Sequence, residues 1–179
     1  MELGRKGYWT AEEALKACID RVQSLAAIHD LLAQDEFKEP DLKRLVEAVA
    51  TAAVRGYSGE ENVEITFSAP PLRLPPKWLS ALALAANELI TNALKHAFPS
   101  RDPGRIAIQV TDGGEEIQLE VRDNGVGIRD VIEEGSRRGV GLEIVTSLVG
   151  TDLRGEFHLR NDGGTVATIR FPKPKDAES

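Results

Sequence analysis

The sequence predicts an α+β domain in which helices pack on a β-sheet, preceded by one or two further helices. Three observations support this fold class. A long, mostly apolar helical stretch lies mid-chain, short stretches of alternating apolar and polar residues surround it, and a helical repeat lies near the N-terminus. With 179 residues, 41% of them hydrophobic and 28% charged, the chain can bury a core within one domain plus a short extension.

Composition excludes several classes of protein. The net charge of −7 argues against broad binding to nucleic acid or to an anionic membrane. The single cysteine, Cys18, rules out an internal disulfide and a cysteine-based metal cluster, as expected in a reducing compartment. The sequence has neither a run of eighteen apolar residues nor a signal-peptide core at its N-terminus, so we expect a soluble, cytoplasmic chain without membrane insertion.

Two helices are predicted in the N-terminal third. Thr10 and Glu13 have capping-box spacing, and the helix that starts there should end near Gln34. Its apolar positions alternate in steps of three and four, as in a helical hairpin or a dimeric bundle: Leu15, Cys18, Val22, Leu25, His29 and Leu32. Asp41 can cap a second helix that runs to about Arg55 and ends at Gly56. Its apolar face comprises Leu42, Leu45, Val46, Val49, Ala53 and Val54.

The central helix is predicted from Leu79 to Phe98, opened by Pro75 and Pro76 and closed before Pro99. Most of its surface is apolar: Leu79, Leu82, Ala86, Leu89, Ile90, Ala93, Leu94 and Ala97. One polar stripe interrupts this surface: Glu88, Asn92, Lys95 and His96. Burial of an unpaired polar group costs about 1–3 kcal/mol, so the stripe either contacts a polar ligand or is the solvent-facing side of a half-exposed helix.

Strands are predicted on both sides of this helix. Val63 to Phe67 alternates, and residues 105–110 and 117–121 form a hairpin around Asp112-Gly113-Gly114. Residues 126–139 read as a loop and 142–148 as a helix. A last hairpin joins 157–159 to 165–171, and the polar tail 173–179 is expected to fray.

Two glycine-containing segments are candidates for chemistry. The alternation of strand 117–121, continued, places Asp123 on the core-facing side, directly before Asn124-Gly125-Val126-Gly127. The segment is either an ordinary turn or a carboxylate that accepts hydrogen bonds from a group above the sheet. The second segment, 139–142, leads into a helix, and it is either a structural loop or a site where backbone N–H groups meet phosphate.

Together these segments have a family resemblance. NELITNALKHA, DNGVG, GVGL and GGTVATIRFP closely resemble the N box, two glycine boxes and final strands of the GHKL ATPase superfamily, over about Leu72 to Pro172. That superfamily includes histidine kinases, gyrase-type topoisomerases, heat-shock chaperones and mismatch-repair ATPases. RVQSLAAIHDLL also resembles the second dimerisation helix of bacterial sensor histidine kinases whose acceptor helix begins His-Arg-x-Lys-Asn.

The resemblance implies a Bergerat-type ATP-binding fold, a two-layer α/β sandwich whose mixed sheet carries helices on one face. It also implies three regions along the chain. Residues 1–38 would be a helix from the dimerisation region, 39–173 the catalytic ATP-binding domain, and 174–179 a disordered tail.

The resemblance also implies roles for the polar stripe of the central helix. Asn92 would coordinate Mg²⁺, with phosphates and water as the other ligands. Glu88 would be the polarising carboxylate near the γ-phosphate of ATP. Lys95 and His96 would neutralise phosphate charge.

The glycine segments receive nucleotide-binding roles by the same resemblance. Asp123 would accept the adenine amino group, helped by Thr165, and Gly125 and Gly127 would shape the adenine side of the pocket. Four residues would bring backbone N–H groups to the phosphates: Gly139, Val140, Gly141 and Leu142. Arg137 and Arg138 are interpreted as solvated arginines of the intervening loop.

The sequence departs from the family pattern in two places. The loop between the glycine boxes is short and contains no phenylalanine, and the His-Arg-x-Lys-Asn motif does not occur. His29 is no substitute, since it occupies a position in the apolar repeat and is interpreted as packing. His158 is interpreted as surface or edge packing.

The expected function is therefore that of a histidine kinase catalytic domain, which transfers the γ-phosphate of Mg·ATP to a histidine on an acceptor helix outside this sequence. The expected partners are ATP, that helix and a response regulator, and a homodimer is the family expectation. Two alternatives stay open: a serine kinase of the anti-sigma-factor type, and a non-catalytic interaction module that binds ATP.

Overall fold

A computed structural model describes residues 15, 19, 26, 42–56, 63–99, 103–128 and 140–175. Within these ranges the elements follow one another as α2 Leu42–Gly56, β1 Val63–Ser68, α3 Pro76–His96, β2 Gly104–Asp112, β3 Glu116–Asp123, α4 Val140–Thr151, β4 Glu156–Asn161 and β5 Thr165–Pro172. Residues 15, 19 and 26 are helical, as predicted for the N-terminal stretch. The other positions of the predicted apolar repeat, His29 among them, lie outside the described residues.

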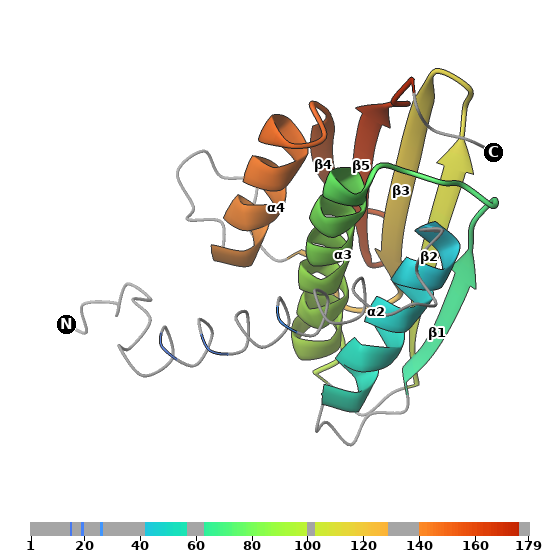
Figure 1. Cartoon of the computed structure of the whole chain (residues 1–179). Coiled ribbons are helices and arrows are strands. Elements are labelled where there is room, and N and C mark those ends of the chain that lie inside the picture. Colours follow the sequence, from blue (N-terminus) through green and yellow to red (C-terminus); the bar gives the residue numbers. More distant parts are fainter. Residues whose placement is uncertain are drawn as a thin grey trace.

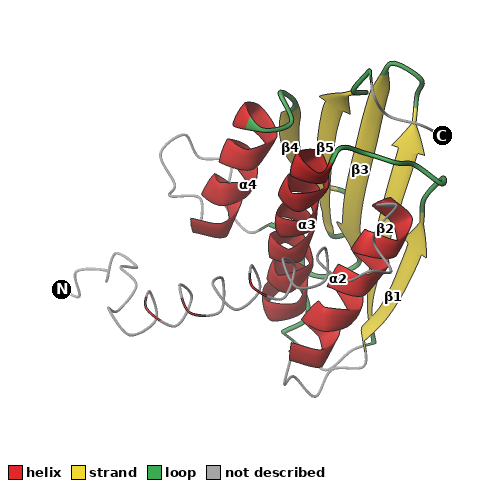
Figure 2. Cartoon of the chain, viewed as in Figure 1, coloured by secondary structure: helices red, strands yellow, loops and turns green. Residues whose placement is uncertain are grey.

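The five strands form one mixed sheet with the order β1-β2-β3-β5-β4. Strand β1 pairs with β2 in parallel, and the other neighbours are antiparallel. Helices α2, α3 and α4 all lie on the same side of this sheet (Figures 1 and 2). The expected two-layer sandwich with helices on one face is confirmed.

The two faces of the sheet differ in chemistry because side chains alternate along each strand. On the helix side, Ile117, Leu119 and Val121 of β3 are buried. On the open side, charged and amide groups pair across strands: the Arg105 guanidinium lies 3.2 Å from Glu64, and the Arg170 guanidinium donates to Gln118 at 2.9 Å. Because the open face is polar, the hydrophobic core forms on the helix side of the sheet.

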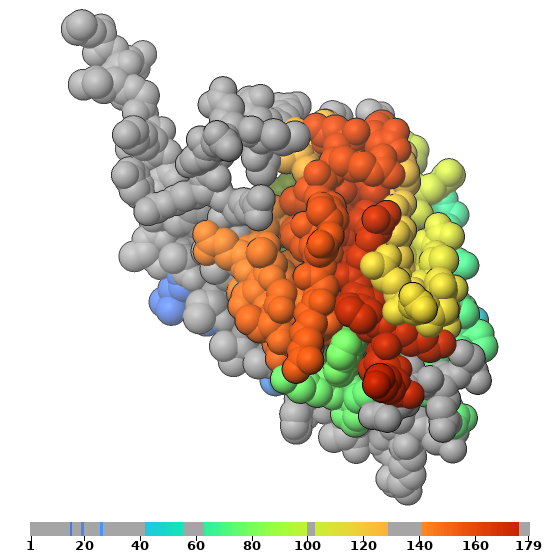
Figure 3. Space-filling model, turned by 90° about the horizontal axis from the view of Figure 1, so that it is seen from above, coloured from blue at the N-terminus to red at the C-terminus, as the bar shows by residue number. Residues whose placement is uncertain are grey.

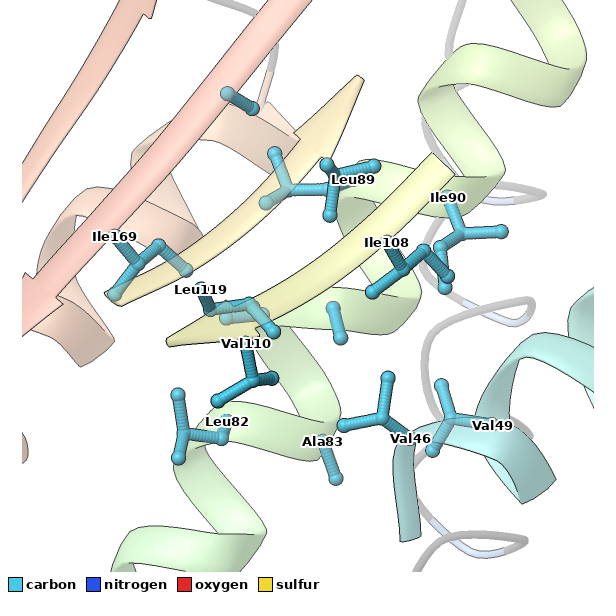
Figure 4. Close-up of a cluster of buried hydrophobic side chains, with 14 of the residues drawn as sticks. Val46, Val49, Leu82, Ala83, Leu89, Ile90, Ile108, Val110, Leu119 and Ile169 are labelled. Atoms are coloured by element: carbon cyan, nitrogen blue, oxygen red, sulfur yellow. The ribbon is translucent and has the colours of Figure 1, made fainter. Parts of the chain in front are cut away.

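Helix α3 is the centre of that core. Every residue of its predicted apolar face is buried: Leu79, Leu82, Ala86, Leu89, Ile90, Ala93, Leu94 and Ala97. Side chains from α2, α3 and three strands interlock there, among them Val46, Leu82, Ile108, Leu119 and Ile169 (Figure 4). The helix starts with Pro76 in its first turn, three residues before the predicted start, where proline lacks only an N–H that would have no helical partner.

Some sequence expectations are wrong in detail. Val54, predicted on the apolar face of α2, is 41% exposed because that face turns away from the core at the last turn. Helix α4 is longer than predicted at both ends. Lys173, expected to fray, is anchored: its N–H donates to the Glu115 carbonyl at 2.7 Å and its Nζ to Asp112 at 2.7 Å.

Helices α3 and α4 pack together and run antiparallel. Lys77, near the start of α3, forms an ion pair of 3.1 Å with Asp152, just after the end of α4. Figure 3 looks onto this end of the molecule, where α4 in orange, β5 in red and the yellow β2–β3 hairpin lie side by side. The start of α4 therefore points toward the opposite end, where α3 and β3 finish (Figure 1). None of the described helices combines the length and apolar character needed to cross a membrane.

Candidate functional site

The candidate site begins with Asp123, the last residue of β3. It is 5% exposed and continues the buried row of that strand, as the alternation predicted. Its Oδ1 accepts two backbone hydrogen bonds, from the Gly125 N–H at 2.9 Å and the Thr165 N–H at 3.0 Å. Both bonds end on the same oxygen, and within the described residues no basic side chain pairs with this carboxylate. Among the described residues, Oδ2 thus has no donor and can accept from another group.

The backbone just before β5 approaches Asp123 closely, and the residue at this point is a glycine, Gly164. Gly164 has a φ of +140°, and a Cβ there would collide with the Asp123 carbonyl oxygen. The backbone can therefore approach Asp123 closely enough for the Thr165 N–H to reach it. The structure thus places Thr165 beside Asp123, and the contact is made by the Thr165 backbone.

The loop that follows Asp123 is bonded on both sides. On the sheet side, the Asn124 side-chain oxygen accepts from the Arg105 N–H at 2.6 Å. On the helix side, the Val126 N–H donates to the Ala97 carbonyl, at the end of α3, at 2.9 Å. A Cβ on Gly125 would collide with that same carbonyl. Gly125 is thus required for the close contact between this loop and the C-terminal end of α3.

A further contact to this loop comes from the end of β4. The side-chain amide of Asn161 accepts from the Ile128 N–H at 2.7 Å and donates to the Ile128 carbonyl at 3.0 Å. Gly127 has a φ of +72°, and a Cβ there would lie 2.7 Å from the Asn161 Oδ1. The sequence pattern indicates Gly127 but not Asn161, because nothing local links a β4 side chain to a loop residue 33 positions earlier.

The exposure of the polar stripe of α3 increases along the helix. Glu88 is 7% exposed, Asn92 is half-buried, and Lys95 and His96 are exposed. Glu88 and Lys95 each take part in an interaction within the chain. Partial burial of the ring, followed by the charge of Lys95, lowers the pKa of His96, so positive charge here comes chiefly from Lys95 near neutral pH. The stripe is buried only at Glu88 and opens toward the end of the helix.

The beginning of α4 lies beside this stripe. Gly141 precedes Asp152 by eleven positions, and Glu88 follows Lys77 by the same number. Since antiparallel α-helices share one rise per residue, Gly141 lies roughly level with Glu88 along the helix axes. The first N–H groups of a helix have no partner within it, and those of Val140, Gly141 and Leu142 are in that position.

The other predicted residues of the second glycine segment are placed as follows. Leu142 packs on the hydrophobic core, so its backbone rather than its side chain faces any ligand. Gly139, Arg137 and Arg138 lie outside the described residues. His158 is exposed on the edge strand β4, as predicted.

The residues present fit a magnesium ion that arrives with a nucleotide. No group of three or more histidine, cysteine, aspartate or glutamate side chains that could hold a metal occurs within the described ranges. The half-buried amide of Asn92 supplies one oxygen of the type that Mg²⁺ prefers. A single such ligand suits an ion whose remaining ligands are phosphate oxygens and water.

The fold is that of an α/β sandwich domain with its helices on one face, and the family match makes its class that of the ATP-binding domains. The chain belongs to the family described as "Histidine kinase-, DNA gyrase B-, and HSP90-like ATPase", whose model matches residues 79–175. That range contains all but the first three residues of α3, together with Asp123 and its loop, α4 and the final hairpin.

Several relatives are histidine kinases by name. The chain is 26% identical over 163 residues to the sensor histidine kinase PdtaS of Mycobacterium tuberculosis, covering 89% of this chain and 32% of that protein. It is 31% identical over 107 residues to blue-light-activated histidine kinase 1 of Erythrobacter litoralis, covering 59% of this chain and 29% of the relative. The chain spans about a third of the length of these relatives.

A solved structure shares the fold. The histidine kinase domain of a blue-light activated histidine kinase from Erythrobacter litoralis superposes with a TM-score of 0.72 at 22% identity. The match covers 90% of this chain and 83% of that domain. The arrangement of sheet and helices is thus that of histidine kinase ATPase domains.

Proposed function

We propose that the chain is the catalytic domain of a sensor histidine kinase, binding Mg·ATP and transferring its γ-phosphate to a histidine on an acceptor helix outside this sequence. The observation that carries the proposal is Asp123: a buried carboxylate, unpaired with any described cation, at the end of the molecule where the stripe of α3 meets the start of α4. Its presence in a member of this ATPase family makes an adenine nucleotide the fitting ligand.

Asp123 would select the base. An adenine amino group is a hydrogen-bond donor, and Oδ2 is the carboxylate oxygen that the Gly125 and Thr165 N–H groups leave to a ligand. The two backbone bonds to Oδ1 hold the carboxylate in one orientation. Gly125 and Gly127 would let the loop backbone lie close to the ring.

The phosphates would lie between α3 and the start of α4. Asn92 would hold the magnesium ion, which when bound neutralises part of the phosphate charge. Lys95 would add positive charge, with His96 beside it, and Glu88 would orient the attacking group. The N–H groups of residues 139–142 would donate to phosphate oxygens.

The chemical step would need little covalent work from this domain. A histidine ring nitrogen forms a bond to the γ-phosphorus, the bond to the bridging β,γ-oxygen breaks, and ADP leaves with that electron pair. The protein would contribute position and charge stabilisation. The phosphate would then pass to a response regulator. The kinase itself would be a cytoplasmic homodimer joined through residues 1–38.

The proposal is tested by isothermal titration calorimetry with ATP, with and without Mg²⁺. We expect binding that strengthens in Mg²⁺, and we expect Asn92→Ala to remove most of that gain while ATP still binds without metal. Loss of the Mg²⁺ effect is specific to the metal role, since a misfolded variant would lose both. An Asn92→Ala variant with an unchanged Mg²⁺ effect would contradict the assignment.

Incubation with labelled ATP and an acceptor helix containing His-Arg-x-Lys-Asn tests the reaction. Acid-labile label on that helix supports the histidine kinase. Acid-stable label on a protein substrate would instead indicate the serine kinase, and tight ATP binding without transfer would indicate the interaction module.

A further inference from the structure

Asn161, the last residue of β4, makes a contact that the proposed site residues do not explain. Its side-chain amide forms a paired hydrogen bond with the backbone of a single residue, Ile128. The two distances, 2.7 Å and 3.0 Å, are those of good hydrogen bonds. The Asn161 amide thus bonds the backbone N–H and carbonyl of Ile128 as a neighbouring strand would, although Ile128 lies in the loop after Asp123.

The residue before this contact is adapted to it. Gly127 has a positive φ and lies so near the Asn161 Oδ1 that any side chain would displace the amide. The same Cβ position would also lie 3.6 Å from the Gly164 carbonyl. The backbone at Gly127 and Ile128 is therefore fitted against the β4–β5 turn.

That turn is itself fixed to the sheet. Asp162 accepts from the Arg160 guanidinium at 2.7 Å and from Arg122 at 3.1 Å, and these two arginines lower its pKa. Arg122 also donates to the Asp162 carbonyl at 3.2 Å. Since Arg122 and Asp123 are consecutive, one holds the turn from the open face and the other accepts the Thr165 N–H from the helix side. The turn therefore has a fixed position relative to Asp123.

We propose that Asn161 is a positioning residue for nucleotide binding: through its amide pair with Ile128 it holds the Gly127–Ile128 backbone at a fixed place relative to Asp123. The inference rests on the proposed function, because the affected property is the affinity for an adenine nucleotide. Asn161 acts through the loop and does not contact the nucleotide.

The experiment compares three variants with the unaltered chain, using Mg·ADP in calorimetry and amide hydrogen exchange at Ile128 by NMR. Asn161→Ala removes both bonds and should weaken ADP binding about tenfold, the equivalent of one or two hydrogen bonds, with faster exchange at Ile128. Asn161→Asp keeps the acceptor for the Ile128 N–H but sets a carboxylate oxygen against the Ile128 carbonyl, so it should also weaken ADP binding and speed exchange at Ile128. His158→Ala, an exposed change on the same strand, should leave both readouts unchanged.

If the unaltered chain binds ADP, either of two results from Asn161→Ala would overturn the positioning role. One is faster exchange at Ile128 with unchanged affinity. The other is weaker binding with unchanged exchange, which would mean that Asn161 acts by another route. If Asn161→Ala fails to fold, Asn161→Asp decides on the same two readouts. Absence of ADP binding by the unaltered chain would overturn the proposed function first, and the positioning role with it.

Discussion

Two aspartates, Asp112 and Asp123, end neighbouring strands of the same sheet with the same local structure. Asp112 ends β2 and Asp123 ends β3, and each is followed two positions later by glycine. In both turns the glycine N–H donates to the aspartate Oδ1 at 2.9 Å, from Gly114 in one and Gly125 in the other. Judged by turn chemistry alone, the two sites are alike.

Their surroundings differ. Asp112 is half-buried, and its Oδ2 accepts from the Lys173 ammonium at 2.7 Å. That bond is the main reason why the pKa of Asp112 lies below its ordinary value. Asp123 is more deeply buried, and its second partner is the Thr165 N–H, again on Oδ1. The same turn thus pairs with a cation at Asp112 and with backbone N–H groups alone at Asp123, as the proposed adenine-binding role of Asp123 requires.

The largest effect is expected from Asp123→Asn. An amide can keep the two bonds on its oxygen, but it then presents a donor where the adenine amino group also donates. We expect ADP affinity by calorimetry to fall at least about a thousandfold, or ~4 kcal/mol. Asp112→Asn is the matched control and should leave ADP affinity within about twofold. Equal affinities for Asp123→Asn and the unaltered chain would refute the adenine assignment.

Two glycines, Gly164 against Asp123 and Gly114 in the Asp112 turn, sharpen the comparison at the level of stability. Gly164→Ala places a methyl group against the Asp123 carbonyl, so the backbone must shift, and we expect a loss of about 3 kcal/mol in denaturant unfolding. Gly114 also has a positive φ, +88°, but a Cβ there would have no neighbour within 4 Å. Gly114→Ala should therefore lower the free energy of unfolding by about 1 kcal/mol, from the backbone strain alone. Similar losses for the two variants would show that the close approach at Asp123 is not what requires glycine.

The smallest effect is expected from Lys173→Met, which removes the cation from Asp112. Stability at neutral pH should fall by about 1 kcal/mol, with ADP affinity unchanged. The pKa of Asp112 is lowered in the folded chain, so the pair stabilises the fold above the ordinary carboxyl pKa, and this contribution is lost as pH falls through the lowered value. Urea midpoints between pH 2 and pH 7 should therefore drop less steeply in the variant. A slope equal to that of the unaltered chain would mean that the pair contributes nothing.

The parts of the structure that depend on local pattern could be predicted from the sequence. The proline boundary gave the start of α3 to within a few residues, and the alternation in β3 placed Asp123 on the buried side. The resemblance to the ATPase family supplied the mixed sheet and its single helical layer, neither of which follows from periodicity.

The parts that depend on distant segments could not be predicted. Asn161 was part of a recognised turn, but its bonds to Ile128 exist only once β4 lies beside the loop. The Ala97 carbonyl is a backbone group and leaves no trace in the sequence. The increase in exposure along the α3 stripe, from Glu88 to His96, depends on tertiary packing and likewise required the structure.

The incomplete bonding of Asp123 makes the empty domain less stable than it could be. An asparagine there would still accept the hydrogen bonds from the Gly125 and Thr165 N–H groups, without the desolvation penalty of a buried carboxylate. A ligand that donates to Asp123 offsets this penalty, so the melting temperature should climb with nucleotide concentration by the ordinary mass-action law. Variants selected for heat resistance alone would drift away from aspartate at this position, and with it from recognition of the base.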